Sequence, residues 1–191
     1  ASEEHCGSNG EGCGVRSGLR EKRLARGFVR SLVSFGVLAV LACNANAADL
    51  DAAETAYGAG DYDAALSEFR ELADLGNAHA QTQLGLMYIN GNGLPQDYAE
   101  AARWFRLAAE QGVAHAQNNL GIMYEYGYGV PANNVAAHMW FNIAGANGGD
   151  AGLENRDRIA KDMMPQDVSE AKQRAKTCVA SQYRNCNQSE D

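Results

Sequence analysis

A repeat of 36 residues is the feature that most constrains how this 191-residue chain can fold. Residues 78–113 and 114–149 align without a gap, and 16 of their 36 positions are identical. The identical positions include Ala-His-Ala-Gln, Leu-Gly, Met-Tyr, Gly-x-Gly, a proline and Trp-Phe. Self-similarity at this period indicates an array of similar supersecondary units, each of which needs its neighbours to bury its apolar face.

Each 36-residue unit predicts two helices separated by a loop. In the first half, Leu, Met and Tyr recur at helical spacing, and a central glycine, Gly85 or Gly121, lets a neighbouring helix approach closely. A Gly-x-Gly pair then ends this helix, because glycine accepts the positive φ of a helix C-cap. Asp97, with Glu100 three positions later, predicts the cap of the second helix.

The second helix of each unit carries an aromatic pair on one face. Trp and Phe stand at the same two places in both units, with alanines around them at helical intervals. An aromatic pair that recurs at the repeat period predicts core packing, and the alternative is an aromatic binding box. The four residues are Trp104, Phe105, Trp140 and Phe141.

The pattern A-x-A-x-x-x-L-G-x-x-Y-x-x-G-x-G-[LV]-P over residues 78–149 resembles the Sel-1-like repeat, a relative of the tetratricopeptide repeat. Residues 48–77 resemble a tetratricopeptide hairpin with a shorter Gly-Asp-Tyr turn, and residues 150–183 resemble a divergent closing hairpin. Residues 184–191 are left as a tail. The resemblance implies an all-α fold, a right-handed α/α solenoid of about four hairpins.

The resemblance also implies a function, because members of this family act mostly as adaptors that hold other proteins. It implies that the first helix of each unit lines the inner, concave surface. Positions on that helix that the core does not need would face a protein or peptide partner. The alternatives are that the small solenoid buries this face on itself or that the face is simply solvated. The candidate partner-binding residues are His79, Thr82, Leu86, Ile89, Asn90, His115, Asn118, Ile122, Glu125 and Tyr126.

Residues 1–47 have the composition of an export signal with an extended N-terminal region. Six Lys and Arg residues between 16 and 30 precede an uncharged apolar run over residues 31–42, and Ala45-Asn46-Ala47 follows as a small-x-small cleavage site. The run is shorter than the roughly 20 residues that span a bilayer. We therefore expect cleavage after Ala47 and a periplasmic or secreted protein. The alternatives are a lipid anchor on Cys43 and a buried core helix.

The charge of the chain disfavours anionic partners. The full sequence has 16 Lys and Arg against 24 Asp and Glu, a net charge of −8. Without residues 1–47 the balance becomes 10 against 20. Nucleic-acid binding proteins instead show a basic patch or stripe. The acidic balance therefore argues against nucleic acid and phospholipid headgroups and leaves a protein or peptide as the expected partner.

Two cysteines follow the predicted cleavage site, Cys178 and Cys186. A cysteine pair in an exported protein predicts a disulfide. Eight residues of unbroken helix would separate them by about 12 Å, which is too far for a bridge. A disulfide therefore requires the last helix to end between them, for which Ser181 and Asn185 are candidate breakers. Two free thiols or a metal site are the alternatives.

The sequence predicts no catalytic, cofactor or metal site. His79 and His115 recur in register without further ligands, and His138 stands alone, so we expect these histidines to be structural or exposed. Ser169 and Lys172 form an S-x-x-K pair, and some cysteine-rich Sel-1-like relatives are associated with β-lactam binding or hydrolysis. A β-lactam- or peptidoglycan-directed hydrolase is therefore the alternative function, although the accompanying motifs are absent and residues 78–149 lack the cysteine pairs of those relatives.

Overall fold

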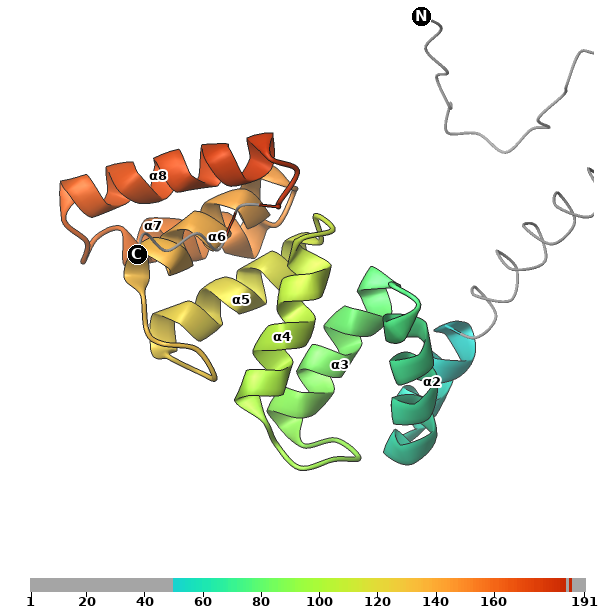
Figure 1. The fold of residues 1–191 in the computed structure, drawn as a ribbon. Coiled ribbons are helices and arrows are strands. Elements are labelled where there is room, and N and C mark those ends of the chain that lie inside the picture. Colours follow the sequence, from blue (N-terminus) through green and yellow to red (C-terminus); the bar gives the residue numbers. More distant parts are fainter. Residues whose placement is uncertain (1–49, 185, 187–191) are drawn as a thin grey trace, which may run out of the picture. The chain divides into compact units, whose positions relative to one another are not determined.

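The structure is a computed structural model that describes residues 50–184 and residue 186, all within one compact unit. Every regular element in this part of the chain is helical, which confirms the predicted all-α class. The predicted signal segment, with Cys43 and Ala47, lies outside the described residues, as does most of the tail. The helices are residues 50–59, α2 (Tyr62–Asp74), α3 (Ala78–Asn90), α4 (Tyr98–Ala109), α5 (Ala114–Tyr126), α6 (Asn134–Ala146), α7 (Asp150–Ile159) and α8 (Pro165–Ala180) (Figure 1).

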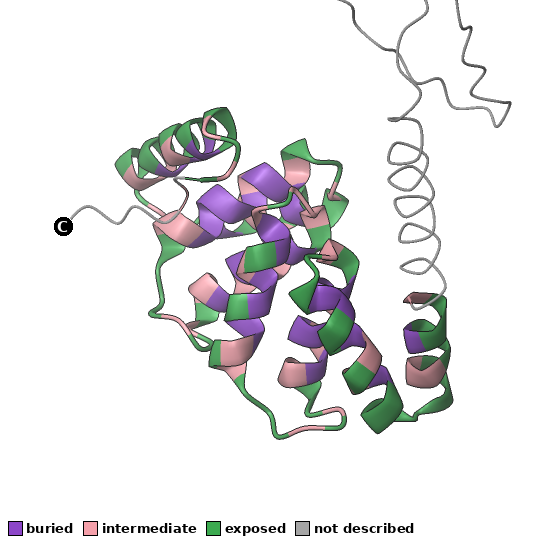
Figure 2. Ribbon diagram, turned by 45° about the vertical axis from the view of Figure 1, so that its right-hand side comes forward, coloured by how far each residue is buried: buried purple, intermediate pink, exposed green. Residues whose placement is uncertain are grey.

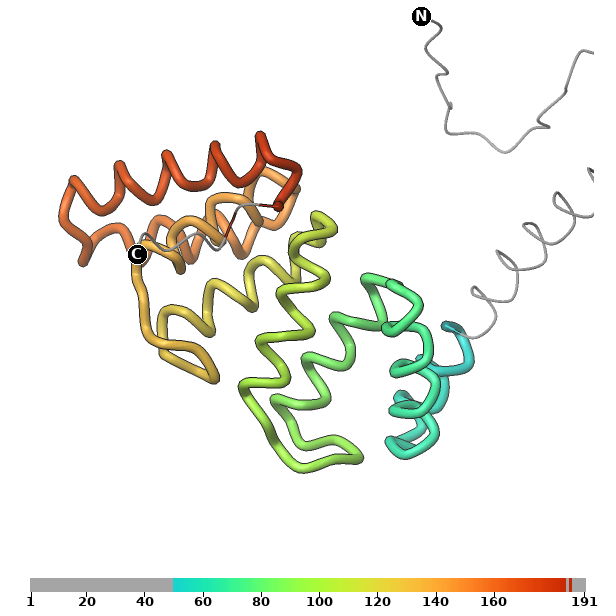
Figure 3. The backbone as a smooth tube through the Cα atoms, in the orientation of Figure 1, coloured from blue at the N-terminus to red at the C-terminus, as the bar shows by residue number. Residues whose placement is uncertain are grey.

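Successive helices pack on one another as antiparallel hairpins. α2 packs on α3, α3 on α4, α4 on α5 and α5 on α6. Figure 3 shows the chain folding back through the loop between α3 and α4 and again through the loop between α5 and α6. These two hairpins correspond to the two 36-residue units, so the fold is the α/α solenoid that the repeat predicted.

The second helix of the first 36-residue unit begins at the predicted capping residue. The Asp97 carboxylate accepts hydrogen bonds from the backbone N–H of Ala99 at 2.9 Å and of Glu100 at 3.1 Å. A reciprocal bond from Glu100 does not form, because the N–H of Asp97 already donates to the carbonyl of Tyr88 at 3.0 Å. Glu100 instead pairs with Arg103 at 3.1 Å. The cap is therefore one-sided, and the loop is tied to the preceding helix.

Close approach between the helices of each hairpin depends on a glycine. A Cβ atom added at Gly85 would lie 2.6 Å from the ring of Phe105, and one added at Gly121 would lie 2.6 Å from the ring of Phe141. Both phenylalanines are fully buried. Trp104 and Trp140, next to them in sequence, are 4% and 0% exposed, which confirms that the aromatic pairs are core. Figure 2 shows buried residues gathered on the helix faces that meet their neighbours.

A buried glutamine joins each hairpin to the one before it. Gln117 donates to the carbonyl of Ala109 at 3.0 Å and accepts a hydrogen bond from Asn147 at 2.9 Å. Gln81, one repeat earlier, makes the same two kinds of bond at 3.1 and 2.8 Å. Each glutamine thus adds a second hydrogen bond to a carbonyl at the end of the preceding helix, which also accepts from the glycine N–H of the following turn. This explains why the repeat keeps a polar residue at a buried position.

The C-terminal helices differ from the predicted closing hairpin. α7 and α8 each pack on α6, and they make few contacts with one another. α7 has only ten residues and buries only Gly152 and Ile159, so it has no broad apolar face to offer α8. α8 uses Ala171, Ala175 and Cys178 to cover the core beside α6 instead. Within residues 50–184, no helix is long and apolar enough to cross a membrane.

Candidate interaction surface

The predicted groove face of α3 is only partly accessible. Thr82 is buried, and its hydroxyl donates to a carbonyl one turn earlier in the same helix at 2.8 Å, so its side chain points into the protein rather than into a groove. Leu86 and Ile89 are half-buried and pack against the core cluster of α4, α5 and α6. Only His79 and Asn90 of this set are exposed.

The corresponding face of α5 is largely covered by α7. Asn118 accepts a hydrogen bond from Asn155 at 2.9 Å. Both carboxylate oxygens of Glu125 accept from Arg158, at 2.6 and 2.7 Å, and this bidentate contact raises the pKa of the guanidinium. Ile122 packs against the small core cluster between α6 and α7. These three residues therefore hold the next first helix in place, because consecutive first helices of a solenoid lie side by side.

Four of the ten predicted residues keep an exposed surface, five are half-buried, and Thr82 is buried. His79 is engaged with Glu54 of the helix of residues 50–59, the first helix of the preceding hairpin, at 2.8 Å. The structure thus does not bring the ten residues together as one open groove. The exposed four are His79, Asn90, His115 and Tyr126.

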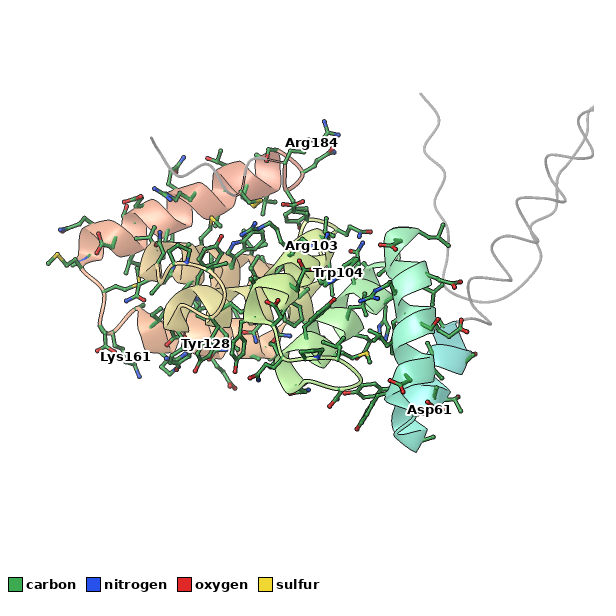
Figure 4. All side chains as sticks on the ribbon, turned by 60° about the horizontal axis from the view of Figure 1, so that its bottom comes forward. Asp61, Arg103, Trp104, Tyr128, Lys161 and Arg184 are labelled. Carbon is green, nitrogen blue, oxygen red and sulfur yellow. A yellow bond between two sulfur atoms is a disulfide. The ribbon has the colours of Figure 1, made fainter. Side chains whose placement is uncertain are left out.

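Three tyrosines stack on one another beside this face, and two of them are exposed. The rings of Tyr98 and Tyr128 lie 5.0 Å apart between centroids with planes at 19°, and those of Tyr126 and Tyr128 lie 5.7 Å apart at 24°. Tyr126 is 56% exposed and Tyr128 is 44% exposed. We call Tyr98, Tyr126 and Tyr128 the tyrosine ridge. Figure 4 labels Tyr128, which belongs to the loop between α5 and α6.

A glycine fixes the loop that carries Tyr128. Gly129 has a φ of 68°, which favours glycine, and an added Cβ atom would overlap the backbone of Tyr98 at the start of α4. The loop therefore lies directly on the preceding repeat, which places Tyr128 against the ring of Tyr98. Sequence reasoning identified Tyr126 alone. The available signal was that tyrosines in the third hairpin replace Asn90 and Asn92 of the second.

The described part of the chain before α7 has more acidic than basic side chains. Residues 50–149 contain 11 Asp and Glu but only three arginines, whereas residues 150–184 contain six acidic and seven basic residues. Arg103 lies over the ring of Trp104, 4.4 Å from its centroid, and the two side chains are labelled together in Figure 4. The net negative charge thus lies before residue 150, mostly in residues 50–77 with seven Asp and Glu and one arginine, whereas residues 150–184 carry no acidic excess.

The S-x-x-K pair has no enclosed surroundings. Ser169 and Lys172 are both exposed on α8, and the described contacts include no hydrogen bond between them. A serine nucleophile needs a base within hydrogen-bond reach to lose its proton. Residues 50–184 and 186 also contain no group of three His, Cys, Asp or Glu that could hold a metal ion.

His138 is buried on α6 without a hydrogen bond to its Nδ1 atom. Burial lowers the pKa of His138, and the positive charges of Lys172 and Arg156 lower it further, against an opposing effect of Asp157. The neutral ring is therefore favoured in the folded protein. His138 acts here as a packing residue between α6 and the C-terminal helices, in agreement with its predicted structural role.

The C-terminal turn is tied down by a disulfide between Cys178 and Cys186. α8 ends at Ala180 with Ser181 at its C-cap, so the helix stops between the two cysteines as the pairing requires. The turn places the Tyr183 hydroxyl 3.0 Å from Asn147 Nδ2, which donates to it. The ring of Tyr183 also lies beside Gly112. The turn therefore covers the side of the solenoid where Gln117 is hydrogen-bonded to Asn147.

Comparison with known proteins gives one family, and the similar solved structures include the two described here. The Sel1 repeat model matches residues 78–113 and 114–149. The crystal structure of c5321, a protective antigen of uropathogenic Escherichia coli with an SLR fold, is 28% identical over 76% of this chain, with a TM-score of 0.68. A Sel1 repeat protein from Oxalobacter formigenes is 24% identical over 72% of this chain, with a TM-score of 0.57, and shows the fold alone.

The aligned region covers different shares of the two related chains, and less than two thirds of each. The aligned region spans 33% of the c5321 chain and 63% of the Oxalobacter chain. No curated protein sequence matches this chain. The similarity therefore concerns the repeat architecture.

Proposed function

We propose, from the two Sel1 repeats over residues 78–149, that this chain is a non-enzymatic scaffold that binds a protein or peptide partner. The observation that carries the proposal is the exposed apolar surface left on the solenoid. Tyr126 and Tyr128 are 56% and 44% exposed although the repeat core beside them is closed. Exposed aromatic clusters with polar neighbours mark interaction sites, and tyrosine is enriched at such sites.

We place the binding surface on the exposed residues of the first helices together with the loop that follows α5. His115 and Tyr126 are exposed on α5, and Asn90 is exposed at the corresponding end of α3. The half-buried members of the predicted set serve packing between helices. This smaller surface replaces the ten-residue groove as the proposed site.

We also propose that the protein works in an oxidising compartment after export. The disulfide between Cys178 and Cys186 supports this, because such bonds persist in the periplasm and outside the cell and are rare in the cytosol. The basic flank, apolar run and Ala45-Asn46-Ala47 of the sequence support it further. The intact mass of the exported protein would test the cleavage site: an N-terminus at Ala48 is expected, and an acylated Cys43 would contradict cleavage after Ala47. An uncleaved chain confined to the cytoplasm would contradict export.

Photocrosslinking in cells tests the binding function. A photoreactive amino acid is introduced at His115 in one variant and at Asn90 in another, because both side chains are exposed. The matched control carries it at Lys176, which is exposed on α8. We expect the same discrete adduct from His115 and Asn90 and none from Lys176. Failure of either first-helix position to give an adduct, or an equal adduct from Lys176, would contradict the proposal.

A further inference from the structure

We propose that α8 is a displaceable strap over a further binding surface, located on α6, and that this surface takes a helix of a protein partner. The partner helix carries small residues at the spacing of Ala171, Ala175 and Cys178, the three residues that α8 buries. Figure 1 shows α8 as the last helix of the molecule, beside α6. The surface belongs to the second helix of a hairpin and is separate from the first-helix surface proposed above.

The face that α8 covers is found by comparing α6 with α4, its counterpart one repeat earlier. Met139 and Ile143 on α6 are 2% and 1% exposed. Arg103 and Leu107, at the same positions of α4, are exposed. Both second helices pack between two first helices, α4 between α3 and α5 and α6 between α5 and α7, but α6 also packs against α8. The additional helix therefore accounts for the burial of Met139 and Ile143.

The side chains that α8 buries on this face are all small. Alanine contributes a single methyl group, so Ala171 and Ala175 remove little apolar area from water for a helix of 16 residues. Within residues 50–184 and 186, no hydrogen bond or ion pair joins a side chain of α8 to another helix, and Arg174 pairs with Glu170 of α8 itself. The middle of α8 is therefore held mainly by the packing of its small residues.

The two ends of α8 attach it to the rest of the molecule. Residues 160–164 connect it to α7, and the turn that follows it is closed by the bond between Cys178 and Cys186. In that turn the Tyr183 hydroxyl accepts a hydrogen bond from Asn147 at 3.0 Å. Elements with few buried apolar contacts open at a lower free energy than the core does. We therefore expect α8 to lift from α6 while the repeats stay folded.

The covered face also contains a polar atom that α8 leaves without a partner. His138 is 1% exposed, and its Nδ1 atom makes no hydrogen bond, although the charge of Lys172 on α8 acts on the ring. Ala102 stands at the same position in α4 and needs no partner. Because buried polar atoms are normally hydrogen-bonded, α8 is an incomplete complement of this face. A partner helix with a hydroxyl or carboxamide group over His138 would complete it.

The kind of occupant is inferred from α8 itself. Its buried residues are spaced by four and then three positions, which places them along one face of a helix. Small residues on that face leave room for the side chains of Met139 and Ile143. Packing of an amphipathic helix against an apolar surface is a recurrent mode of recognition, and methionine adapts its shape to different partners. A helix of another protein with the same small-residue spacing therefore fits the surface.

The test uses the purified, disulfide-bonded chain and a fluorescein-labelled peptide of residues 165–180 with Cys178→Ala, which represents the partner helix. Two variants of the chain loosen α8 in different ways. Ala175→Gln enlarges a buried residue of α8, and Cys186→Ser opens the turn after it without changing its buried face. The matched control is Lys176→Gln, at an exposed neighbouring position. Fluorescence anisotropy measures the affinity, and circular dichroism verifies that each chain is folded.

Both loosened chains should bind the peptide at least tenfold more tightly than the wild type and the control. The reason is that the apparent affinity rises with the fraction of molecules in which α8 is displaced. A peptide that itself carries Ala175→Gln should bind these chains at least tenfold more weakly. A photoreactive amino acid at position 172 of the peptide should give an adduct within α6, which mass spectrometry locates.

Any of four results would overturn the proposal: no binding to either loosened chain, no gain over the Lys176→Gln control, equal binding of the Ala175→Gln peptide, or an adduct outside α6. A dimer of the Cys186→Ser chain in light scattering would overturn it as well, because a second copy would then be the occupant. None of these results changes the photocrosslinks expected from His115 and Asn90, so failure of this proposal and failure of the first-helix surface are distinguishable.

Discussion

The second and third hairpins, residues 78–113 and 114–149, have the same internal packing and different surfaces. Both use a glycine against a phenylalanine ring, a buried tryptophan and a buried glutamine at equivalent positions. They differ at the loop tip and on the faces that meet the rest of the chain. The differing pairs include Ile89 and Glu125, Asn90 and Tyr126, Asn92 and Tyr128, and Ala102 and His138.

The differences follow from what covers each hairpin. The second hairpin lies between two others, and Ile89 packs against an apolar neighbour. The third hairpin is followed by the polar helix α7, and Glu125 at the equivalent position binds Arg158 of that helix. The two hairpins thus share the residues that pack inside each hairpin. They differ at residues that contact only a neighbouring element or a partner. Function is to be sought among the changed positions that no neighbour covers, and these include Tyr126 and Tyr128.

The largest expected effect tests whether the two cores are equivalent. Trp140→Ala and Trp104→Ala each remove a buried indole, and each should lower the free energy of unfolding by about 3–5 kcal/mol. Urea denaturation followed by circular dichroism measures both. Wild-type stability in either variant would show that the hairpins are not packed alike.

The disulfide should distinguish the third hairpin from the second. Cys186→Ser removes the bridge and leaves the buried Cys178 in place. Because the cysteines are eight positions apart, loss of the loop constraint should cost about 2.5 kcal/mol.

Hydrogen exchange locates the effect of Cys186→Ser. We expect faster exchange at the C-terminal end of α8 and around Asn147, which binds Tyr183, with α3 unchanged. Uniform loss of protection through both hairpins, or no change near Asn147, would contradict the separate role of the C-terminal turn.

The helix contacts at Gly85 and Gly121 should respond equally to a methyl group. Gly85→Ala and Gly121→Ala would each place a Cβ atom 2.6 Å from a buried phenylalanine ring. Overpacking should lower the free energy of unfolding by about 1–3 kcal/mol, reduced by the better helix propensity of alanine. Gly58→Ala is the control, because nothing lies within 4 Å of its added Cβ atom. Equal melting temperatures for all three variants would show that the close approach does not matter.

The smallest effect concerns His138, which replaces Ala102 of the second hairpin. Burial and the positive charges of Lys172 and Arg156 hold the pKa of His138 below its usual 6.5. Between pH 7.5 and 5.5 the unfolded chain therefore takes up a proton on this residue before the folded chain does, and stability falls as the pH falls.

His138→Ala should reduce this dependence on pH. The melting temperature of the variant should fall less between pH 7.5 and 5.5 than that of the wild type. The comparison uses the difference between the two pH values, because loss of the side chain also changes the packing. An identical pH dependence of the melting temperature in both proteins would show that His138 does not cause it.

The sequence by itself determined the periodic part of this protein. The helix pairs, the glycines of close approach, the Asp97 cap and the buried Trp-Phe pairs could all be predicted. A contact that recurs every 36 residues places the same residue types at the same spacing in each unit, so the sequence alone is sufficient to predict it. The position at which α8 had to end for a disulfide also followed from the distance between the cysteines.

Only the tertiary structure decided the contacts that do not recur from one repeat to the next. The burial of Thr82 and the covering of Glu125 by Arg158 depend on which helix lies alongside, and α7 and α8 do not share the repeat pattern. Tyr98 and Tyr128 are 30 residues apart, and their stacking needs the loop to lie on the preceding hairpin. The spacing of residues along the sequence does not reveal such contacts. Each occurs once and joins segments that become neighbours only in the folded solenoid.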